Sequence, residues 1–248
     1  MGRVLCVVNQ KGGVGKTTTA INLAVGLAKS GAHTLLVDLD PQCNATTGLG
    51  QTPADTHPLV ADTPLKPALR QPGVDRLDLL PGSRAFRDVE ALTHGDERHT
   101  ARLRHSLSNG LNGYDFVLID CPPSVGALTQ TALASSGEIL MPIQCEYFAM
   151  EGLAQMIDVI RAVMQRRPNE LQFAGIVLTM YDHTLELTHE VEGQVRDFFG
   201  EIVYQTVIPR DVVVSEAPSH GRSVIDYAPR SRGARAYVEL CMEVLERD

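Results

Sequence analysis

The residues best suited to chemistry lie near the start of the chain, in residues 9–17, which read NQKGGVGKT. The chain has only four lysines, and two of them, Lys11 and Lys16, stand in this segment. Glycines allow backbone N–H groups to turn toward phosphate oxygens, a lysine neutralises phosphate charge, and a threonine hydroxyl can bind magnesium. The segment therefore predicts a phosphate-binding loop in which Lys16 reaches the β- and γ-phosphates and Thr17 contacts the metal.

Such a loop requires a strand before it and a helix after it. Residues 3–8 form a short β-branched apolar run, which predicts the strand. Apolar residues at helical spacing follow Lys16, and Gly31 stands where a helix commonly ends. Residues 34–39 (TLLVDL) are nearly all apolar, as expected of a parallel strand buried on both faces. A strand–helix–strand unit therefore opens the chain.

Strand and helix patterns alternate through the remaining sequence. Expected strands cover residues 76–80, 114–120, 138–143, 172–180 and 202–208. Expected helices cover residues 83–92, 98–109, 125–135, 151–167, 185–199, 212–217 and 232–246. Five prolines between residues 51 and 73 predict a surface excursion that holds one short helix. The pattern predicts one α/β domain over residues 1–248: a three-layer P-loop NTPase fold whose mostly parallel sheet is covered by helices on both faces.

Composition restricts the class of protein further. Hydrophobic residues make up 44% and charged residues 21% of the chain, as in globular proteins. No apolar run approaches the roughly 18 residues that span a bilayer, and the first apolar stretch is too short for a signal peptide, so we expect a cytoplasmic protein. Five cysteines without a CxxC pair indicate reduced thiols. The net charge of −8 means that nucleic-acid binding would require a local basic patch.

The loop departs from the strict pattern GxxxxGK[ST], because Gln10 stands where the first glycine belongs and Lys11 follows it. In this it resembles the deviant phosphate loop of the ParA/MinD family of ATPases, and further segments resemble the chromosomal ParA/Soj branch. These segments are residues 37–42 (VDLDPQ), 44–46 (NAT), 118–124 (LIDCPPS), 144–147 (QCEY), 151–153 (EGL), 178–182 (LTMYD), 207–210 (VIPR) and 215–221 (SEAPSHG). The resemblance covers nearly the whole chain and implies ATP and Mg²⁺ as cofactors.

The resemblance also implies a role for each site residue. Asp40 would orient the attacking water, and Lys11 would cross a dimer interface to the phosphates of the partner subunit. Asp38, Asp40 and Asp120 would support magnesium. An aspartate at a strand end can instead cap the following turn, and for Asp38 the two readings are equally open. The remaining nucleotide contacts would come from the loop and from the ends of the last two strands: Gly12, Gly13, Val14, Gly15, Thr18, Met180, Pro209 and Asp211. Relatives commonly carry asparagine at the last of these positions.

Two functions compete on this basis. The first is a switch for the segregation of a chromosome or plasmid. Such a protein dimerises on ATP and binds double-stranded DNA non-specifically, which would place it on the nucleoid. A ParB-type partner would stimulate hydrolysis and so reset the switch. The alternative is a related positioning ATPase with a non-centromere cargo. A nitrogenase-type reductase is disfavoured by the cysteine positions. Membrane targeting of the MinD type is disfavoured because the chain end, ELCMEVLERD, is acidic.

The expected DNA contacts are where the chain departs from the family. Thr184 and Val213 stand where relatives carry arginines, and Cys43 replaces the usual glycine. The remaining basic residues form two groups, and we predict that the second one binds DNA because fewer acidic residues interrupt it. The first group is Arg98, Arg102 and Arg104, and the second is Arg222, Arg230, Arg232 and Arg235. These arginines could equally be ordinary surface residues.

Overall fold

A seven-stranded sheet forms the centre of the computed structural model, which describes residues 2–61, 63–86, 101, 105, 113–146, 149–166 and 171–247. All of its strand pairs are parallel, and the strand order is β3-β2-β4-β1-β5-β6-β7. The strands are β1 (Arg3–Val7), β2 (Thr34–Asp38), β3 (Leu77–Leu80), β4 (Phe116–Asp120), β5 (Glu138–Gln144), β6 (Gln172–Tyr181) and β7 (Val203–Pro209). The predicted α/β fold with a parallel sheet is confirmed.

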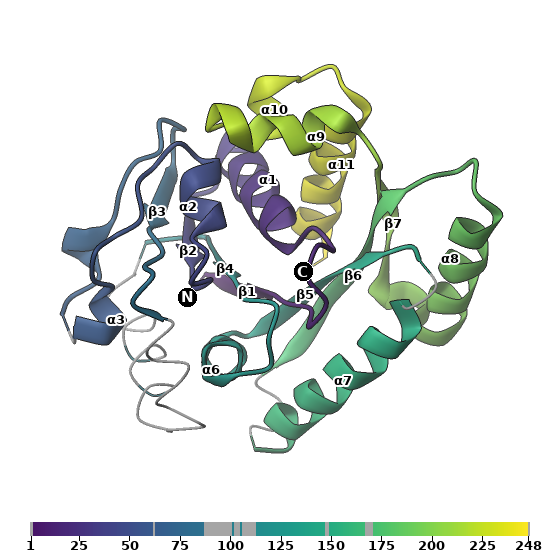
Figure 1. Cartoon of the computed structure of the whole chain (residues 1–248), viewed down its shortest axis with the longest axis horizontal. Coiled ribbons are helices and arrows are strands. Elements are labelled where there is room, and N and C mark those ends of the chain that lie inside the picture. Colours follow the sequence, from purple (N-terminus) through teal and green to yellow (C-terminus); the bar gives the residue numbers. More distant parts are fainter. Residues whose placement is uncertain are drawn as a thin grey trace.

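Helices cover both faces of the sheet, which gives three layers (Figure 1). One face carries α1 (Lys16–Lys29), α9 (Val212–Glu216), α10 (Val224–Tyr227) and α11 (Arg232–Glu246). The opposite face carries α6 (Ala127–Ser135), α7 (Ala149–Arg166) and α8 (Glu186–Phe199). Short helices α2 (Asn44–Gly48) and α3 (Pro58–Ala61) lie beside β2 and β3. Three 3₁₀ turns, at Lys66–Ala68, Gly200–Ile202 and Ala217–His220, complete the described helical segments.

The alternation of side chains along each strand divides the core into two clusters. In β1, Val4 and Cys6 point into the cluster beneath α6 and α7, whereas Leu5 and Val7 point into the cluster beneath α1 and α11. This follows from the two-residue period of a strand, and both faces are dry because helices cover them. The apolar runs in the sequence are therefore the signature of a sheet buried on both sides.

Most expected elements are present with boundaries shifted by one or two residues. Gly31 follows α1 with a φ of 103°, the left-handed conformation that ends a helix and favours glycine. The proline-rich excursion holds α3, as predicted, together with a 3₁₀ turn. Helix α2 and helix α10 were not predicted, because each spans less than two turns and has no readable periodicity. The predicted helices at 83–92 and 98–109 lie largely outside the described residues.

The strand order determines where a site can form. The chain crosses from β1 to the β2 side of the sheet and later returns to β5 on the other side, so β1 lies between β4 and β5. Loops that leave the carboxyl ends of such neighbouring strands diverge and leave room for a ligand. Val7, Asp120 and Asp38 stand in register on β1, β4 and β2. In the described part of the chain, no helix is long and apolar enough to cross a membrane.

Candidate nucleotide site

The predicted phosphate loop connects β1 to α1 at the carboxyl edge of the sheet. Gly13 and Gly15 adopt positive φ angles of 77° and 89°, a conformation that glycine reaches without steric cost. Asn9 fixes the start of the loop, because its Nδ2 donates to the Pro142 carbonyl at 2.8 Å and its Oδ1 accepts from the Lys11 N–H at 3.0 Å. At the other end, the Thr179 hydroxyl of β6 donates to the Val14 carbonyl at 2.9 Å. Neighbouring strands therefore hold the loop in shape.

The two loop lysines lie in different surroundings. Lys16 is buried, with 6% of its surface exposed, and its Nζ donates to the Lys11 carbonyl at 2.9 Å. Burial lowers the pKa of Lys16, although Asp120, Cys121 and Asp40 oppose the shift. A buried ammonium that donates to a backbone carbonyl keeps further N–H donors for an anionic ligand. Lys11 stands at the rim of the loop, where 28% of its side chain is exposed, and it forms an ion pair with Glu146.

Asp120 at the end of β4 is the carboxylate most suited to a metal. Both of its oxygens are buried and have no hydrogen-bond partner among the described residues. Burial and the neighbouring Asp38 raise its pKa well above the ordinary value, while the Thr17 hydroxyl and the Lys16 ammonium act in the opposite direction. A divalent cation would supply the missing counter-charge, and carboxylate and hydroxyl oxygens are ligands that Mg²⁺ prefers. Asp120 and Thr17 therefore fit magnesium.

A magnesium ion at Asp120 and Thr17 could take further ligands from phosphate oxygens and water. Among the residues that the structure describes, no group of three or more His, Cys, Asp or Glu side chains is arranged to hold a metal. Mg²⁺ usually binds through one or two protein carboxylates together with substrate phosphates and water. Asp120 and Thr17 would be the protein's ligands to such a nucleotide-bound magnesium ion.

Asp38 has a structural task in addition to its proximity to the site. Its Oδ2 accepts from the Thr46 N–H at 2.8 Å and from the Thr46 hydroxyl at 2.6 Å, and its Oδ1 accepts from the Asp40 N–H at 3.2 Å. Gly82 packs so closely that a Cβ there would lie 2.8 Å from the Asp38 carboxyl carbon. Burial raises the pKa of Asp38 to about 6. These hydrogen bonds support the turn-capping role of Asp38, and its magnesium role stays a prediction.

Asp40 begins the loop after β2 and is 5% exposed. Its Oδ1 accepts from the Gln42 N–H at 2.8 Å, which bends the chain toward α2. Cys43 follows with a φ of 57°, a left-handed conformation that favours glycine and gives a physical reason for the glycine usual in relatives. Asp40 is one of the carboxylates that raise the pKa of Lys16, and its role in orienting water stays a prediction.

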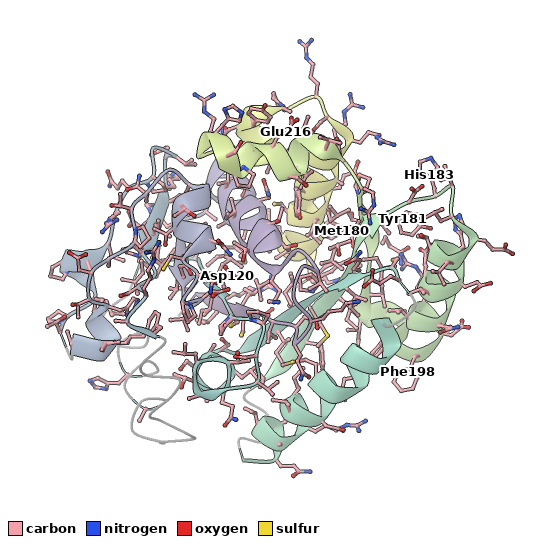
Figure 2. All side chains as sticks on the ribbon, in the orientation of Figure 1. Asp120, Met180, Tyr181, His183, Phe198 and Glu216 are labelled. Atoms are coloured by element: carbon pink, nitrogen blue, oxygen red, sulfur yellow. The ribbon has the colours of Figure 1, made fainter. Side chains whose placement is uncertain are left out.

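The predicted adenine contacts come together at the ends of β6 and β7. Tyr181 pairs with Pro209, which brings Met180 and Pro209 near each other beside the loop held by Thr179. Met180 has a φ of 50° where β6 ends. Figure 2 shows Asp120 beneath α1 and α2, and Met180 farther across the sheet, toward β7.

The carboxylate of Asp211 is used within the fold. It accepts from the Val213 N–H at 3.4 Å, as the N-cap of α9, and from the Gly233 N–H at 3.0 Å. These two bonds join α9 to the start of α11. The adenine contact of Asp211 stays a prediction.

The predicted DNA-binding arginines lie around α10 and α11. Arg222, Arg230, Arg232 and Arg235 are all exposed. Within the described part of the chain, none of them has an ion-pair partner within 4.0 Å. Thr184 is also exposed and bonds to Asp182, whereas Val213 packs against the core beneath α11. The competing group at Arg98, Arg102 and Arg104 lies outside the described residues.

Three contributors to the site were not among the predicted site residues. Asn9 and Thr179 hold the loop by hydrogen bonds, and Glu146 pairs with Lys11. Asn9 follows the first predicted strand, and Thr179 precedes the predicted contact Met180. Thr179 and Glu146 also stand in segments 178–182 and 144–147, whose resemblance to the family was a second signal. Nothing local in the sequence links Glu146 to Lys11, because 135 residues separate them.

The parallel sheet, the phosphate loop and the carboxylates at its edge define a P-loop nucleoside triphosphatase with a deviant loop lysine. A family model described as an AAA domain matches residues 2–173. The chain is 43% identical over 249 residues to the sporulation initiation inhibitor protein Soj of Bacillus subtilis, with 98% of each chain covered. It is 45% identical to the chromosome-partitioning ATPase Soj of Thermus thermophilus, covering 99% of this chain and 96% of that one.

Solved structures agree with this result. Cobyrinic acid a,c-diamide synthase from Mycobacterium smegmatis, with a bound ATP analogue and magnesium, superimposes with a TM-score of 0.84 at 32% identity, covering 99% of this chain and 95% of that one. The chain belongs to the ParA/Soj family of chromosome-partitioning ATPases. It is an ATPase, and its site fits ATP and Mg²⁺.

Proposed function

We propose that this protein is an ATP-dependent dimerising switch for chromosome or plasmid segregation. The observation that carries the proposal is the different placement of the two loop lysines. Lys16 lies buried beneath the loop, where it can neutralise phosphates bound by its own chain, whereas Lys11 stands at the exposed rim. A rim lysine can reach a ligand held by a second molecule. ATP would then join two protomers, each supplying Lys11 to the nucleotide of the other.

The chemistry assigned to the site is transfer of the γ-phosphoryl group to water. This reaction depends mainly on neutralising charge and positioning the nucleophile. Lys16 and the loop N–H groups hold the phosphates, and Asp40 accepts a hydrogen bond from the attacking water and orients it. Thr17 and Asp120 would hold Mg²⁺, which supplies counter-charge to the phosphate oxygens, and Asp38 keeps the Asp40 loop in position. The adenine would lie against Met180, Pro209 and Asp211.

Dimerisation would couple this site to DNA. The exposed arginines around α10 and α11 supply positive charge without an acidic partner within the described part of the chain, and pairing two protomers doubles their number. Binding through phosphates is independent of sequence and would place the ATP-bound dimer on the nucleoid in the cytoplasm. Hydrolysis, stimulated by a ParB-type partner near Asp40 and Asp120, would return the protein to monomers.

A related positioning ATPase with a non-centromere cargo is the second candidate. It is favoured by the net charge of −8 and by Thr184 and Val213, which replace two arginines usual in the family. Both candidates share the nucleotide chemistry and the dimer. They differ in whether a ParB-type protein resets the switch.

Turnover measurements test the proposal. We expect slow hydrolysis by the purified protein alone, and faster hydrolysis when DNA and a ParB-type protein from the same genome are both added. Fast hydrolysis by the protein alone would contradict a timing switch and indicate a metabolic ATPase. Slow hydrolysis that the ParB-type protein leaves unchanged would favour the positioning ATPase.

A further inference from the structure

The Lys11–Glu146 ion pair joins the phosphate loop to the segment that follows β5. Glu146 is placed there by the backbone: its N–H donates to the Gln144 carbonyl at 2.9 Å, and the Cys145 N–H donates to the Thr179 carbonyl at 3.4 Å. Because β5 is the neighbour of β1, the carboxylate of Glu146 faces the loop that leaves β1. The pair is therefore a contact within one chain that the fold itself produces.

A second ion pair at the opposite end of β5 provides a standard for comparison. Arg3 binds Glu138 through two nitrogens, at 2.8 and 2.6 Å, and also donates to the Val244 carbonyl. The side chains of Arg3 and Glu138 are 22% and 21% exposed. Those of Lys11 and Glu146 are 28% and 39% exposed. The Arg3 pair is a two-point clamp, and the Lys11 pair is a single contact of a flexible side chain near solvent. A competing anion can therefore displace the Lys11 pair more easily.

The backbone of Lys11 is tied to the state of the nucleotide site. The Lys16 Nζ donates to the Lys11 carbonyl at 2.9 Å, and phosphate would compete for the same ammonium group. Phosphate in the site would therefore draw on the same ammonium group that now binds the backbone of Lys11. The ammonium of Lys11 remains on Glu146 until a stronger anion attracts it.

We infer that Glu146 restrains dimerisation by holding Lys11 within its own chain, so that each protomer must break the Lys11–Glu146 pair before Lys11 can serve the partner's nucleotide. This inference rests on the proposed function, in which Lys11 acts across the dimer. Glu146 is thus a positioning residue that acts through Lys11. Its partner is a second copy of this chain carrying a nucleoside triphosphate.

The expected size of the effect follows from the exposure of the pair. Ion pairs exposed to this degree shift an equilibrium by about 1.4- to 5-fold. Two such pairs break for each dimer that forms, so their effects multiply. Removing the restraint should therefore lower the dimer dissociation constant by roughly 2- to 30-fold.

The test is sedimentation velocity over a range of protein concentrations with a non-hydrolysable ATP analogue and Mg²⁺. Glu146→Gln keeps the size of the side chain and removes its charge. The matched control is Glu138→Gln, which removes a charge from the other ion pair of β5. We expect tighter dimers for Glu146→Gln and an unchanged dissociation constant for Glu138→Gln. Unchanged or weaker dimers for Glu146→Gln would overturn the inference.

The double variant separates this inference from the function on which it rests. If Glu146 acts through Lys11, then adding Glu146→Gln to Lys11→Ala changes nothing, since there is no lysine to release. A Glu146→Gln effect that persists in the Lys11→Ala background would overturn the inference and leave the trans role of Lys11 intact. Dimers of normal strength in Lys11→Ala alone would instead refute the trans role, whatever Glu146 does.

Discussion

The carboxyl edge of the sheet and the arginine surface around α10 and α11 differ in how firmly the fold holds their functional side chains. At the sheet edge, Lys16, Asp38 and Asp120 are buried, and hydrogen bonds hold the side chains of Lys16 and Asp38 in place. On the arginine surface, Arg222 and Arg230 are exposed and have no acidic partner within the described part of the chain. Phosphoryl transfer needs fixed geometry, whereas binding to a phosphate backbone needs only charge. Substitutions at the sheet edge should therefore impair ATP binding or turnover, whereas substitutions on the arginine surface should impair DNA binding.

Lys16→Ala should have the largest effect, because it removes the buried cation of the site. Deleting one partner of a buried charge pair costs about 2–5 kcal/mol, so ATP affinity should fall by roughly 30-fold or more, and dimers and turnover should be lost with it. Equilibrium binding of a fluorescent ATP analogue measures this. Lys29→Ala, at the far end of α1, is the matched control and should bind normally, because Lys29 pairs with Asp226. Normal ATP affinity in Lys16→Ala would refute the site.

Asp40→Asn should separate binding from chemistry. The amide oxygen can still accept from the Gln42 N–H, so the loop keeps its shape while the charge that orients water is removed. Turnover should fall by about 100-fold or more while ATP binding and dimerisation persist. A single-turnover assay on preformed dimers shows this directly. Wild-type turnover would mean that another group orients the water.

Charge removal on the arginine surface should leave the nucleotide site intact and weaken DNA binding alone. Each phosphate contact contributes close to one unit to the slope of log affinity against log salt, so a combined Arg230→Ala, Arg232→Ala and Arg235→Ala variant should lose up to about three units per protomer. Fluorescence anisotropy with duplexes of two unrelated sequences measures the slope. The same triple change at Arg98, Arg102 and Arg104 is the comparison. If only that comparison variant loses affinity, the surface assignment is wrong.

A smaller effect concerns the pH dependence of stability, to which His57 contributes from outside both regions. His57 is fully buried against Phe86, and burial lowers its pKa to about 3 from an ordinary 6.5. Below pH 6.5 the unfolded chain binds a proton that the folded chain does not, so His57 makes stability fall as the pH falls toward 3, by up to about 1.4 kcal/mol per pH unit.

His57→Leu should remove this contribution. The loss of the acceptor for the Leu59 N–H is a cost that does not vary with pH, so it leaves the slope unaffected. Urea unfolding between pH 5 and 7 measures the slope, and His33→Leu, at an exposed position, is the control. An equal slope in wild type and His57→Leu would show that His57 titrates normally in the fold.

The sequence predicted the sheet and the phosphate loop because both depend on local patterns. A strand buried on both faces must be apolar, and a loop that turns N–H groups inward must contain glycine, as at Gly13 and Gly15. Helices α2 and α10 escaped prediction because four or five residues carry no period. Their positions depend on tertiary contacts, such as the bonds from Thr46 to Asp38.

The parts of the site that could not be predicted are contacts between distant segments. The Lys11–Glu146 pair and the Thr179 bond to the loop join residues 135 and 165 positions apart. The Asp211 carboxylate caps α9 and binds the start of α11, contacts that its position in the sequence did not indicate, and its adenine contact stays a prediction. Side chains of this kind have several possible partners, and only the packed structure selects one.

The central claim is that the nucleotide at the sheet edge controls the DNA contacts of the arginine surface. The most direct test is a salt-dependent DNA titration of the unmodified protein with ATP, with ADP and without nucleotide. The account predicts that only the ATP-bound protein binds DNA tightly, independently of sequence and with a steep slope of log affinity against log salt. Binding with ADP or without nucleotide should be weak. DNA binding that is equal in all three states would contradict the claim, and so would its absence with ATP.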